Sequence, residues 1–231
     1  MKKANTYHTN IPNINTSDGD KLIFPFSPPI FQTELNDNLI KELLDEGRKL
    51  DMKNDYSPKL AGKLKSGRSY IYEDDFILKF EPKLLQLATD YFNGLYEIYG
   101  ENYKGVNSIL RVQKERGEIT PGKLRLDTLW VNFQHKGDHN PPHTHTGQLS
   151  FVIYLQVDKK IFTVDADSNS HDAGKIIFQY GEQMTHLMGN DYPVNPYTGL
   201  MFMFPARLKH FVPPFWIDSE RISVSGNLIV I

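Results

Sequence analysis

Five histidines lie at spacings that could support metal chemistry. His135, His139, His143 and His145 share one short stretch, and His210 lies in the later segment MFMFPARLKHFVPP. In extended backbone, residues i and i+2 point to the same side, so the imidazoles of His143 and His145 can hold one ion. Such pairs also occur by chance. An H-x-H pair that enters an apolar strand, followed by a histidine near a later strand end, predicts a metal site in a β-sandwich.

The ligand type narrows the choice of metal. Imidazoles suit zinc, copper, iron and nickel, and three ligands on one face with open positions suit non-haem Fe(II) and oxygen chemistry. Arg221 follows His210 by eleven residues, and Ser223 lies two residues further on. On neighbouring antiparallel strands, His210 and Arg221 would face the same cavity, where a guanidinium binds a carboxylate in a bidentate manner. These residues favour a small dicarboxylate that also reaches the metal, and 2-oxoglutarate has that form.

Three motifs in this order resemble the Fe(II)/2-oxoglutarate-dependent oxygenase superfamily: H-T-H at His143–His145, F-P-A-R-L-K-H at Phe204–His210 and R-I-S at Arg221–Ser223. The resemblance is closer to oxygenases of bacteria and of tailed phages of marine cyanobacteria, and it spans about Asp127 to the end of the chain. Those proteins also share W-x-N, N-x-x-H-x-H and S-x-x-x-Y-L motifs. The counterparts here are Trp130, Asn132, Asn140, His143, His145, Ser150, Tyr154 and Leu155.

The resemblance implies a mainly β chain folded as a double-stranded β-helix, which is a cupin-like jelly roll, with supporting N-terminal helices. It implies Fe(II), 2-oxoglutarate and O2 as cofactor and co-substrates, and hydroxylation of an unactivated C–H bond with release of succinate and CO2. The substrate would be a peptidyl prolyl or other amino-acid side chain, a free amino acid or a small metabolite. The implied metal ligands are His143, His145 and His210, the implied catalytic residues are these three and Arg221, and the implied 2-oxoglutarate contacts are Arg221, Ser223, Tyr154 and Asn132.

Position 145 departs from the pattern of the superfamily. Most members place Asp or Glu two residues after the first histidine, whereas this chain has His145 there. A third imidazole leaves the iron with one less negative charge. Asp127 and Asp138 are the other candidates for a carboxylate ligand, although neither has the expected spacing. Tyr154 also fits ordinary strand packing as well as it fits a co-substrate contact.

Two other functions fit the same residues. A three-histidine, cupin-like dioxygenase would keep the metal without 2-oxoglutarate and use Arg221 as a substrate anchor. A non-catalytic jelly roll, such as a structural or carbohydrate-binding protein, would bind no metal tightly.

The elements that must position these residues change character near residue 106. Apolar periodicity predicts helices over Asn36–Leu50 and Pro82–Tyr99, with Asn36 as an N-cap and Pro82 in a first turn. The polar stretch between them, residues 55–75, is predicted to be a surface loop. Short segments rich in Val, Ile, Phe and Tyr then predict strands of a sandwich or jelly roll. They are Ser108–Lys114, Lys123–Gln134, Gln148–Val157, Lys160–Asp165, Lys175–Tyr180, Gly199–Phe204 and Arg221–Ile231.

The last of these strands has two unlike faces. Apolar residues from Ile222 to Val230 alternate with Arg221, Ser223, Ser225 and Asn227. The stretch Gly181–Thr198, which contains His186, is predicted to be a long loop near the substrate entrance. Five aromatic residues are candidates for the mouth of the cavity: Trp130, Phe133, Phe151, Phe211 and Trp216.

Length and composition set the remaining expectations. The 231 residues suit an extended or disordered arm at 1–20 and one domain at 21–231, divided into helical support at 21–105 and a jelly-roll core at 106–231. The 26 basic and 28 acidic side chains leave no electrostatic footprint for nucleic acid, and the absence of cysteine excludes disulfides and thiolate ligands. No apolar run reaches the roughly 20 residues of a membrane-spanning helix. We expect a cytoplasmic protein, in the host cytoplasm if a phage encodes it, with a small-molecule or peptidyl substrate. The sequence does not determine the oligomeric state and is compatible with a homo-oligomer.

Overall fold

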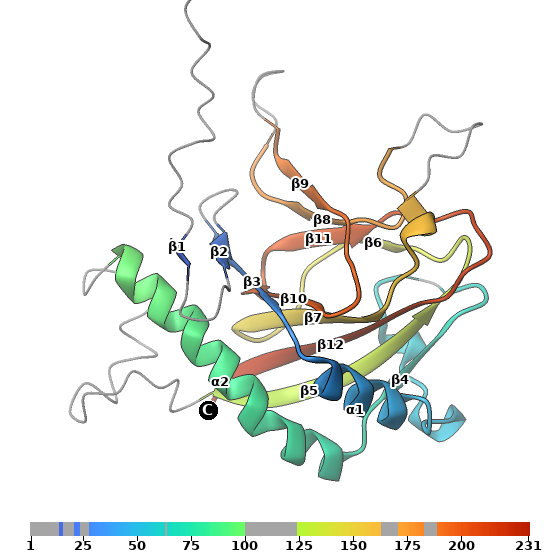
Figure 1. Cartoon of the computed structure of the whole chain (residues 1–231), viewed down its shortest axis with the longest axis horizontal. Helices are drawn as coiled ribbons and strands as arrows, with labels where there is room; N and C mark the ends of the chain where they lie inside the picture. Colours follow the sequence, from blue (N-terminus) through green and yellow to red (C-terminus); the bar gives the residue numbers. More distant parts are fainter. Residues whose placement is uncertain are drawn as a thin grey trace, which may run out of the picture.

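The computed structural model describes residues 14–15, 21–23, 28–62, 64–99, 124–162, 171–182 and 189–231. The predicted strand Ser108–Lys114, His186 and most of the predicted arm lie outside these residues. Within the described part of the chain, two antiparallel sheets face each other, and two helices cover the outer face of the larger sheet (Figure 1). This arrangement confirms a mainly β double-stranded β-helix with supporting helices.

The larger sheet has eight strands in the order β1-β2-β3-β10-β7-β12-β5-β4. Their bounds are Ile14–Asn15, Lys21–Ile23, Ile30–Glu34, Leu200–Pro205, Leu149–Gln156, Arg221–Val230, Leu124–Gln134 and Arg68–Ile71. The smaller sheet has four strands in the order β6-β11-β8-β9. These are Asn140–His143, Lys209–Val212, Ile176–Gln179 and Asp191–Val194.

Five predicted strands are confirmed as β5, β7, β8, β10 and β12. The strand predicted at Lys160–Asp165 is wrong over its described part, because Lys159–Phe162 forms a 3-10 helix. Asp158 starts that turn, since its carboxylate accepts the N–H of Lys160 at 2.9 Å and its carbonyl accepts the N–H of Ile161. The two predicted loops also contain strands that the sequence did not reveal: β9 pairs with β8, and β4 pairs with β5. Both are short edge strands without a long apolar run.

Helix α1 spans Asp37–Gly47, and the predicted N-cap is confirmed because the side chain of Asn36 accepts the N–H of Leu39 at 3.0 Å. Helix α2 spans Asp74–Tyr99, so it begins eight residues before the predicted start. Acidic residues in its first turn favour that start through the helix dipole. Pro82 lies inside the helix on an exposed face, where solvent can satisfy the carbonyl that loses its partner.

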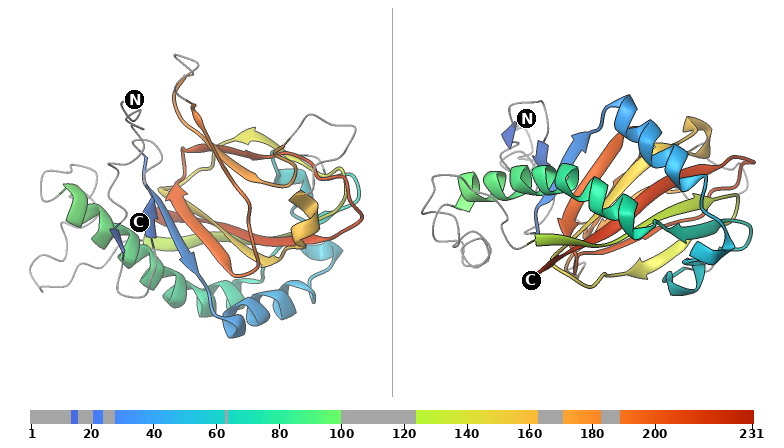
Figure 2. Two further views of the ribbon diagram at one scale, coloured as in Figure 1. Left: turned by 45° about the horizontal axis from the view of Figure 1, so that its top comes forward. Right: turned by 90° about the horizontal axis from the view of Figure 1, so that it is seen from below.

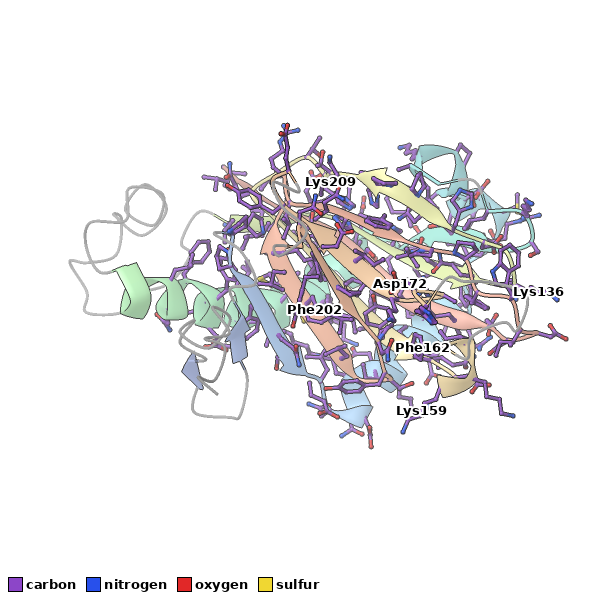
Figure 3. The ribbon with its side chains drawn as sticks, turned by 90° about the horizontal axis from the view of Figure 1, so that it is seen from above. Lys136, Lys159, Phe162, Asp172, Phe202 and Lys209 are labelled. Atoms are coloured by element: carbon purple, nitrogen blue, oxygen red, sulfur yellow. The ribbon has the colours of Figure 1, made fainter. Side chains whose placement is uncertain are left out.

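Two apolar layers result from this arrangement. One lies between the helices and the larger sheet, which the two helices cross in Figure 2, and it contains Phe151, Ile153 and Leu155 of β7. The other lies between the two sheets and contains Val152 and Tyr154 of the same strand. Strand β7 is therefore buried on both faces. Figure 3 views the molecule from the side of the smaller sheet. The exposed Lys136, Lys159 and Lys209 lie toward the outside of the molecule, and the buried Phe202 lies in its interior.

Strand β12 has the two faces that its sequence predicted. Ile222, Val224 and Leu228 belong to the layer under the helices, so the alternate residues face the smaller sheet. None of the helices in the described part of the chain has the length and apolar character that a membrane crossing requires.

Candidate active site

A cavity of about 350 Å³ lies between the two sheets. Its wall combines the polar face of β12 with side chains of β5, β7 and β10 from the larger sheet, and with side chains of β6, β8 and β11 from the smaller sheet. Six residues that precede β4 complete the wall: Tyr56, Lys59, Leu60, Ala61, Gly62 and Leu64. The polar face of the last strand thus lines a cavity instead of an outer surface.

Three histidines meet on the wall of this cavity. His143 on β6 and His210 on β11 are cross-strand partners, and His145 lies two residues past the end of β6. The backbone N–H of His145 donates to the carbonyl of Ala206 at 2.8 Å, which holds this residue beside the turn that leads into β11. One ligand nitrogen of each ring lies within 4.8 Å of the other two. The structure therefore brings together three residues of the predicted metal site.

The hydrogen bonds of two rings determine which nitrogen each presents to the cavity. Nδ1 of His143 lies 2.8 Å from the carbonyl oxygen of Pro141, and Nδ1 of His210 lies 2.9 Å from that of Leu208. A carbonyl oxygen only accepts, so each Nδ1 carries the proton and each Nε2 presents its lone pair toward the cavity. The distance between Nε2 of His145 and Nε2 of His210 is 3.2 Å.

That distance fits a shared metal. Two nitrogens bound at about 2.1 Å to one ion, at angles between 90° and 109°, are roughly 3.0–3.4 Å apart. Beside the cluster, the side-chain oxygen of Asn140 is buried without a hydrogen-bond partner, while the amide nitrogen of Asn140 lies 3.4 Å from Nε2 of His143. The residues present therefore fit a divalent metal held by imidazoles.

Burial lowers the pKa of all three imidazoles. It lowers the pKa of His145 to about 4, with the charge of His143 as the second cause. For His210, burial and then the charges of the other two histidines hold the pKa well below its usual value. Burial also lowers the pKa of His143. The three rings are thus uncharged near neutral pH, which is the form that binds metal.

Neither alternative carboxylate reaches this cluster. Asp138 is buried, and its carboxylate accepts the backbone N–H groups of residues 65–67 and of His135 at 2.7–3.3 Å. Asp127 is exposed on β5. In the described part of the chain, the group that could hold a metal contains histidines only.

Arg221 lines the same cavity, but its strand is not paired with the strand that carries His210. That expectation is wrong, since β11 belongs to the smaller sheet and β12 to the larger, and the two residues line the cavity from opposite sheets. Arg221 is buried, with Nε donating to Oε1 of Gln134 at 3.1 Å, one terminal nitrogen donating to Gly174 O at 2.5 Å, and the other also bonding to Gln134. These bonds use three of the five N–H groups of a guanidinium.

The other predicted contact residues surround Arg221. Asn132, Ser223 and Tyr154 form one row across β5, β12 and β7, directly beside the pair Gln134 and Arg221. All five line the cavity. Burial raises the pKa of Tyr154, so its hydroxyl stays protonated and can donate.

The outer part of the wall was missed by sequence reasoning. Tyr56 stacks on Trp130 with ring centroids 5.3 Å apart, and Trp130 stacks on His145 at 5.7 Å. Lys59, whose Nζ lies near the Tyr56 ring, also lines the cavity. In the sequence, Tyr56 and Lys59 lie in a polar, turn-rich stretch that gave no signal of this role. Of the aromatic candidates for the mouth, Trp130 and Phe151 line the cavity, whereas Phe133, Phe211 and Trp216 do not. His139 lies on the wall outside the metal cluster, and His135 and His171 lie elsewhere.

The chain is similar to one family model and to several solved structures. Residues 128–227 match the model of a family described as "Putative 2OG-Fe(II) oxygenase". No curated protein sequence matches the chain. Among solved structures, the chain is similar to the non-heme alpha ketoglutarate dependent epimerase SnoN from nogalamycin biosynthesis, with a TM-score of 0.53 and 16% identity over 87% of this chain and 77% of that one.

Two further structures are similar over 87% of this chain. A prolyl-4-hydroxylase from Pseudomonas putida has 16% identity, a TM-score of 0.48 and 92% of its own chain covered. HygX from Streptomyces hygroscopicus, solved with nickel and 2-oxoglutarate bound, has 9% identity, a TM-score of 0.49 and 82% of its chain covered. The matched segment 128–227 contains the three histidines and Arg221 of the cavity, so the chain is similar to the 2OG-Fe(II) oxygenase family over the part that forms the site.

Proposed function

We propose that this chain is an Fe(II)- and 2-oxoglutarate-dependent oxygenase that hydroxylates an unactivated C–H bond of a small-molecule or peptidyl substrate. The observation that carries the proposal is one cavity with uncharged imidazoles on one sheet and a buried guanidinium on the other. Residues 21–231 would act as a single domain. Bound together, Fe(II) and 2-oxoglutarate would supply the activation of O2, with succinate and CO2 as products of the co-substrate.

His143, His145 and His210 would hold the metal through Nε2 atoms. Two of these rings are fixed by backbone carbonyls, so little rotamer freedom is lost when a metal binds. Three ligands on one face leave positions of an octahedral ion open for the co-substrate and for oxygen.

Arg221 would bind the carboxylate of 2-oxoglutarate that lies farther from the metal. Two N–H groups of its guanidinium remain for that carboxylate after the bonds to Gln134 and Gly174. Ser223, Tyr154 and Asn132 present a hydroxyl, a phenol and an amide beside it. Because Arg221 is buried, its bonds to a carboxylate would be little screened by water.

The test is the conversion of 2-oxoglutarate by the full chain. Protein supplied with Fe(II), ascorbate and 2-oxoglutarate under oxygen should form succinate even without a known substrate, at a low uncoupled rate. EDTA or the absence of oxygen should stop it. Stoichiometric metal binding with no succinate, over many protein equivalents of 2-oxoglutarate, would contradict the proposal.

One observation favours a second candidate. The metal group has three neutral ligands and no carboxylate, as in a three-histidine dioxygenase that uses no 2-oxoglutarate. In that case Arg221 would anchor the substrate itself, and calorimetry would find no 2-oxoglutarate binding to the metal-loaded protein.

A further inference from the structure

The wall of the cavity has a one-sided charge. Among the residues that line it in the described part of the chain, none is Asp or Glu, whereas two are permanent cations, Arg221 and Lys59. The metal group adds three neutral imidazoles and no carboxylate. A divalent metal here would therefore have no negative protein ligand to offset its charge.

The bound co-substrate does not neutralise this cavity. The two carboxylates of 2-oxoglutarate offset two positive charges, but a divalent metal and Arg221 together provide three. The cavity would retain a positive charge before Lys59 is considered. Because the field of a concave, poorly screened site is additive, an anionic group is favoured there and a cationic group is opposed.

Lys59 lies at the outer end of a row of rings that leads to the metal group. Its Nζ lies 5.5 Å from the ring centroid of Tyr56, which stacks on Trp130, which in turn stacks on His145. All of these residues line the cavity. Lys59 is exposed, and no carboxylate of the described residues forms an ion pair with it. Burial and then the charge of Asp127 raise the pKa of the Tyr56 hydroxyl, but Asp127 does not line the cavity.

The segment that carries Lys59 is fixed against the rest of the molecule. The carboxylate of Asp138 accepts the N–H groups of residues 65–67. A Cβ atom at Gly62 would lie 2.4 Å from the carbonyl oxygen of His139, and one at Gly67 would lie 2.1 Å from that of Phe133. Glycine at these two positions lets the segment pack closely against β5 and the β5–β6 connection, where the hydrogen bonds to Asp138 hold it. These contacts therefore fix the backbone that carries Lys59 at the cavity wall.

We infer that the substrate of this cavity carries an anionic group that contacts Lys59, while its reacting carbon lies toward the histidines. This inference rests on the proposed function, because it names the substrate class of the same cavity. The positive charge of the wall excludes cationic substrates, and neutral substrates would lack the ionic contact with Lys59.

The experiment uses three probes with one apolar body and different charges: 3-phenylpropionate, 3-phenylpropionamide and 3-phenylpropylamine. Calorimetry on the full chain first measures the binding of Mn2+ and 2-oxoglutarate, and then of each probe with both present, so that the Arg221 end is occupied. Lys59→Glu is compared with Lys209→Glu. Lys209 is the matched control because it is exposed on β11 beside His210, lies outside the cavity wall, and changes the net charge equally.

We expect the anion to bind the unaltered protein most tightly and the amine most weakly. Lys59→Glu should weaken the binding of the anion about tenfold and the binding of the amide less than about twofold. Lys209→Glu should leave both affinities within about twofold of those of the unaltered protein. The inference fails if the amide or the amine binds as tightly as the anion, if no anion binding is detected, or if the two variants behave alike. Failure of the proposed function is a separate result, namely no binding of Mn2+ or 2-oxoglutarate, and the probes then test Lys59 on the protein alone.

Discussion

At the scale of single residues, the candidate site depends on which atoms are already bonded within the protein. The Nδ1 atoms of His143 and His210 are bonded to carbonyls, so their Nε2 atoms face the cavity. The carboxylate of Asp138 is bonded to backbone N–H groups, so it is not available to a metal. Arg221 is only partly bonded. These bonds separate the groups that bind ligands from the groups that support the fold.

His210→Ala should remove the metal. A direct ligand should cost more than the ten- to hundredfold loss of affinity that outer-shell partners cause. His139→Ala is the control, because His139 lines the cavity outside the histidine group. Metal content after gel filtration and a far-ultraviolet circular dichroism spectrum decide the result. Full metal occupancy in a folded His210→Ala protein would remove this residue from the ligand set.

Arg221→Ala should weaken 2-oxoglutarate binding by about thirtyfold or more, since truncating a buried charged partner costs about 2–5 kcal/mol. Metal affinity should change by less than about threefold. Arg221→Lys keeps the charge but loses the fork, so it should give an intermediate affinity. Titration calorimetry with each ligand measures both affinities, with the exposed Arg207→Ala as control. Loss of metal affinity with retained 2-oxoglutarate affinity would contradict the assignment.

At the scale of elements, one buried carboxylate attaches the segment before β4 to the rest of the wall. Asp138 accepts four backbone N–H groups from two separate parts of the chain. An isosteric Asn places an NH2 group where two of these donors point, so donors face donors.

Asp138→Asn should lower the free energy of unfolding by about 2–4 kcal/mol. Asp218→Asn, on an exposed residue without such bonds, should have almost no effect. Urea unfolding followed by circular dichroism compares the two. A loss below about 0.5 kcal/mol for Asp138→Asn would show that these hydrogen bonds do not hold the segment.

The two helices are joined by charges. Glu42 of α1 lies 2.8 Å from Nζ of Lys79 and 2.6 Å from Nζ of Lys83, both on α2. Hydrogen bonds from Lys79 and then Lys83 hold the pKa of Glu42 below its usual value of 4.5. Because the folded pKa is lower than the unfolded one, this stabilisation is present above about pH 4.5 and is lost as the pH falls through the folded pKa.

Glu42→Gln should therefore destabilise the protein by about 0.5–1 kcal/mol at pH 7 in low salt, since all three partners are partly exposed. The difference from the unaltered protein should shrink in 1 M salt and below pH 4. Asp45→Asn, which removes a pair within α1 only, is the control. Urea midpoints at two salt concentrations measure the effect, and a salt-independent loss would argue against an ionic cause.

At the scale of the whole molecule, the site lies between layers. The helices and the larger sheet form one rigid layer through a shared apolar core. The smaller sheet supplies His143 and His210 from above, and the larger sheet supplies Arg221 from below. A ligand that touches both sheets binds the folded state only, so it stabilises the whole domain.

Fe(II) or Mn2+ with 2-oxoglutarate, each at about a hundred times its dissociation constant, should raise the melting temperature by about 10–20 °C. EDTA should reverse the rise. Thermal unfolding measured by differential scanning fluorimetry tests this, with His210→Ala as the protein that should show no metal-dependent rise. An equal rise in that variant would place the ligands outside the cavity.

Much of the candidate site was visible in the sequence. The H-x-H spacing indicated that His143 and His145 share a side, and the alternation in Arg221–Val230 indicated an apolar and a polar face. These are local properties, because the two-residue repeat of extended backbone fixes which side chains share a face. The helix cap at Asn36 was equally local, since the side chain bonds to an N–H three residues away.

Only the tertiary structure decided which faces meet. His145 and His210 are 65 residues apart, and their contact depends on β6 pairing with β11. Arg221 was expected beside His210 and instead faces it from the other sheet. The bonds of Asp138 and the place of Lys59 in the wall also join distant segments. Such contacts are set by how whole layers pack, which no short window of residues determines.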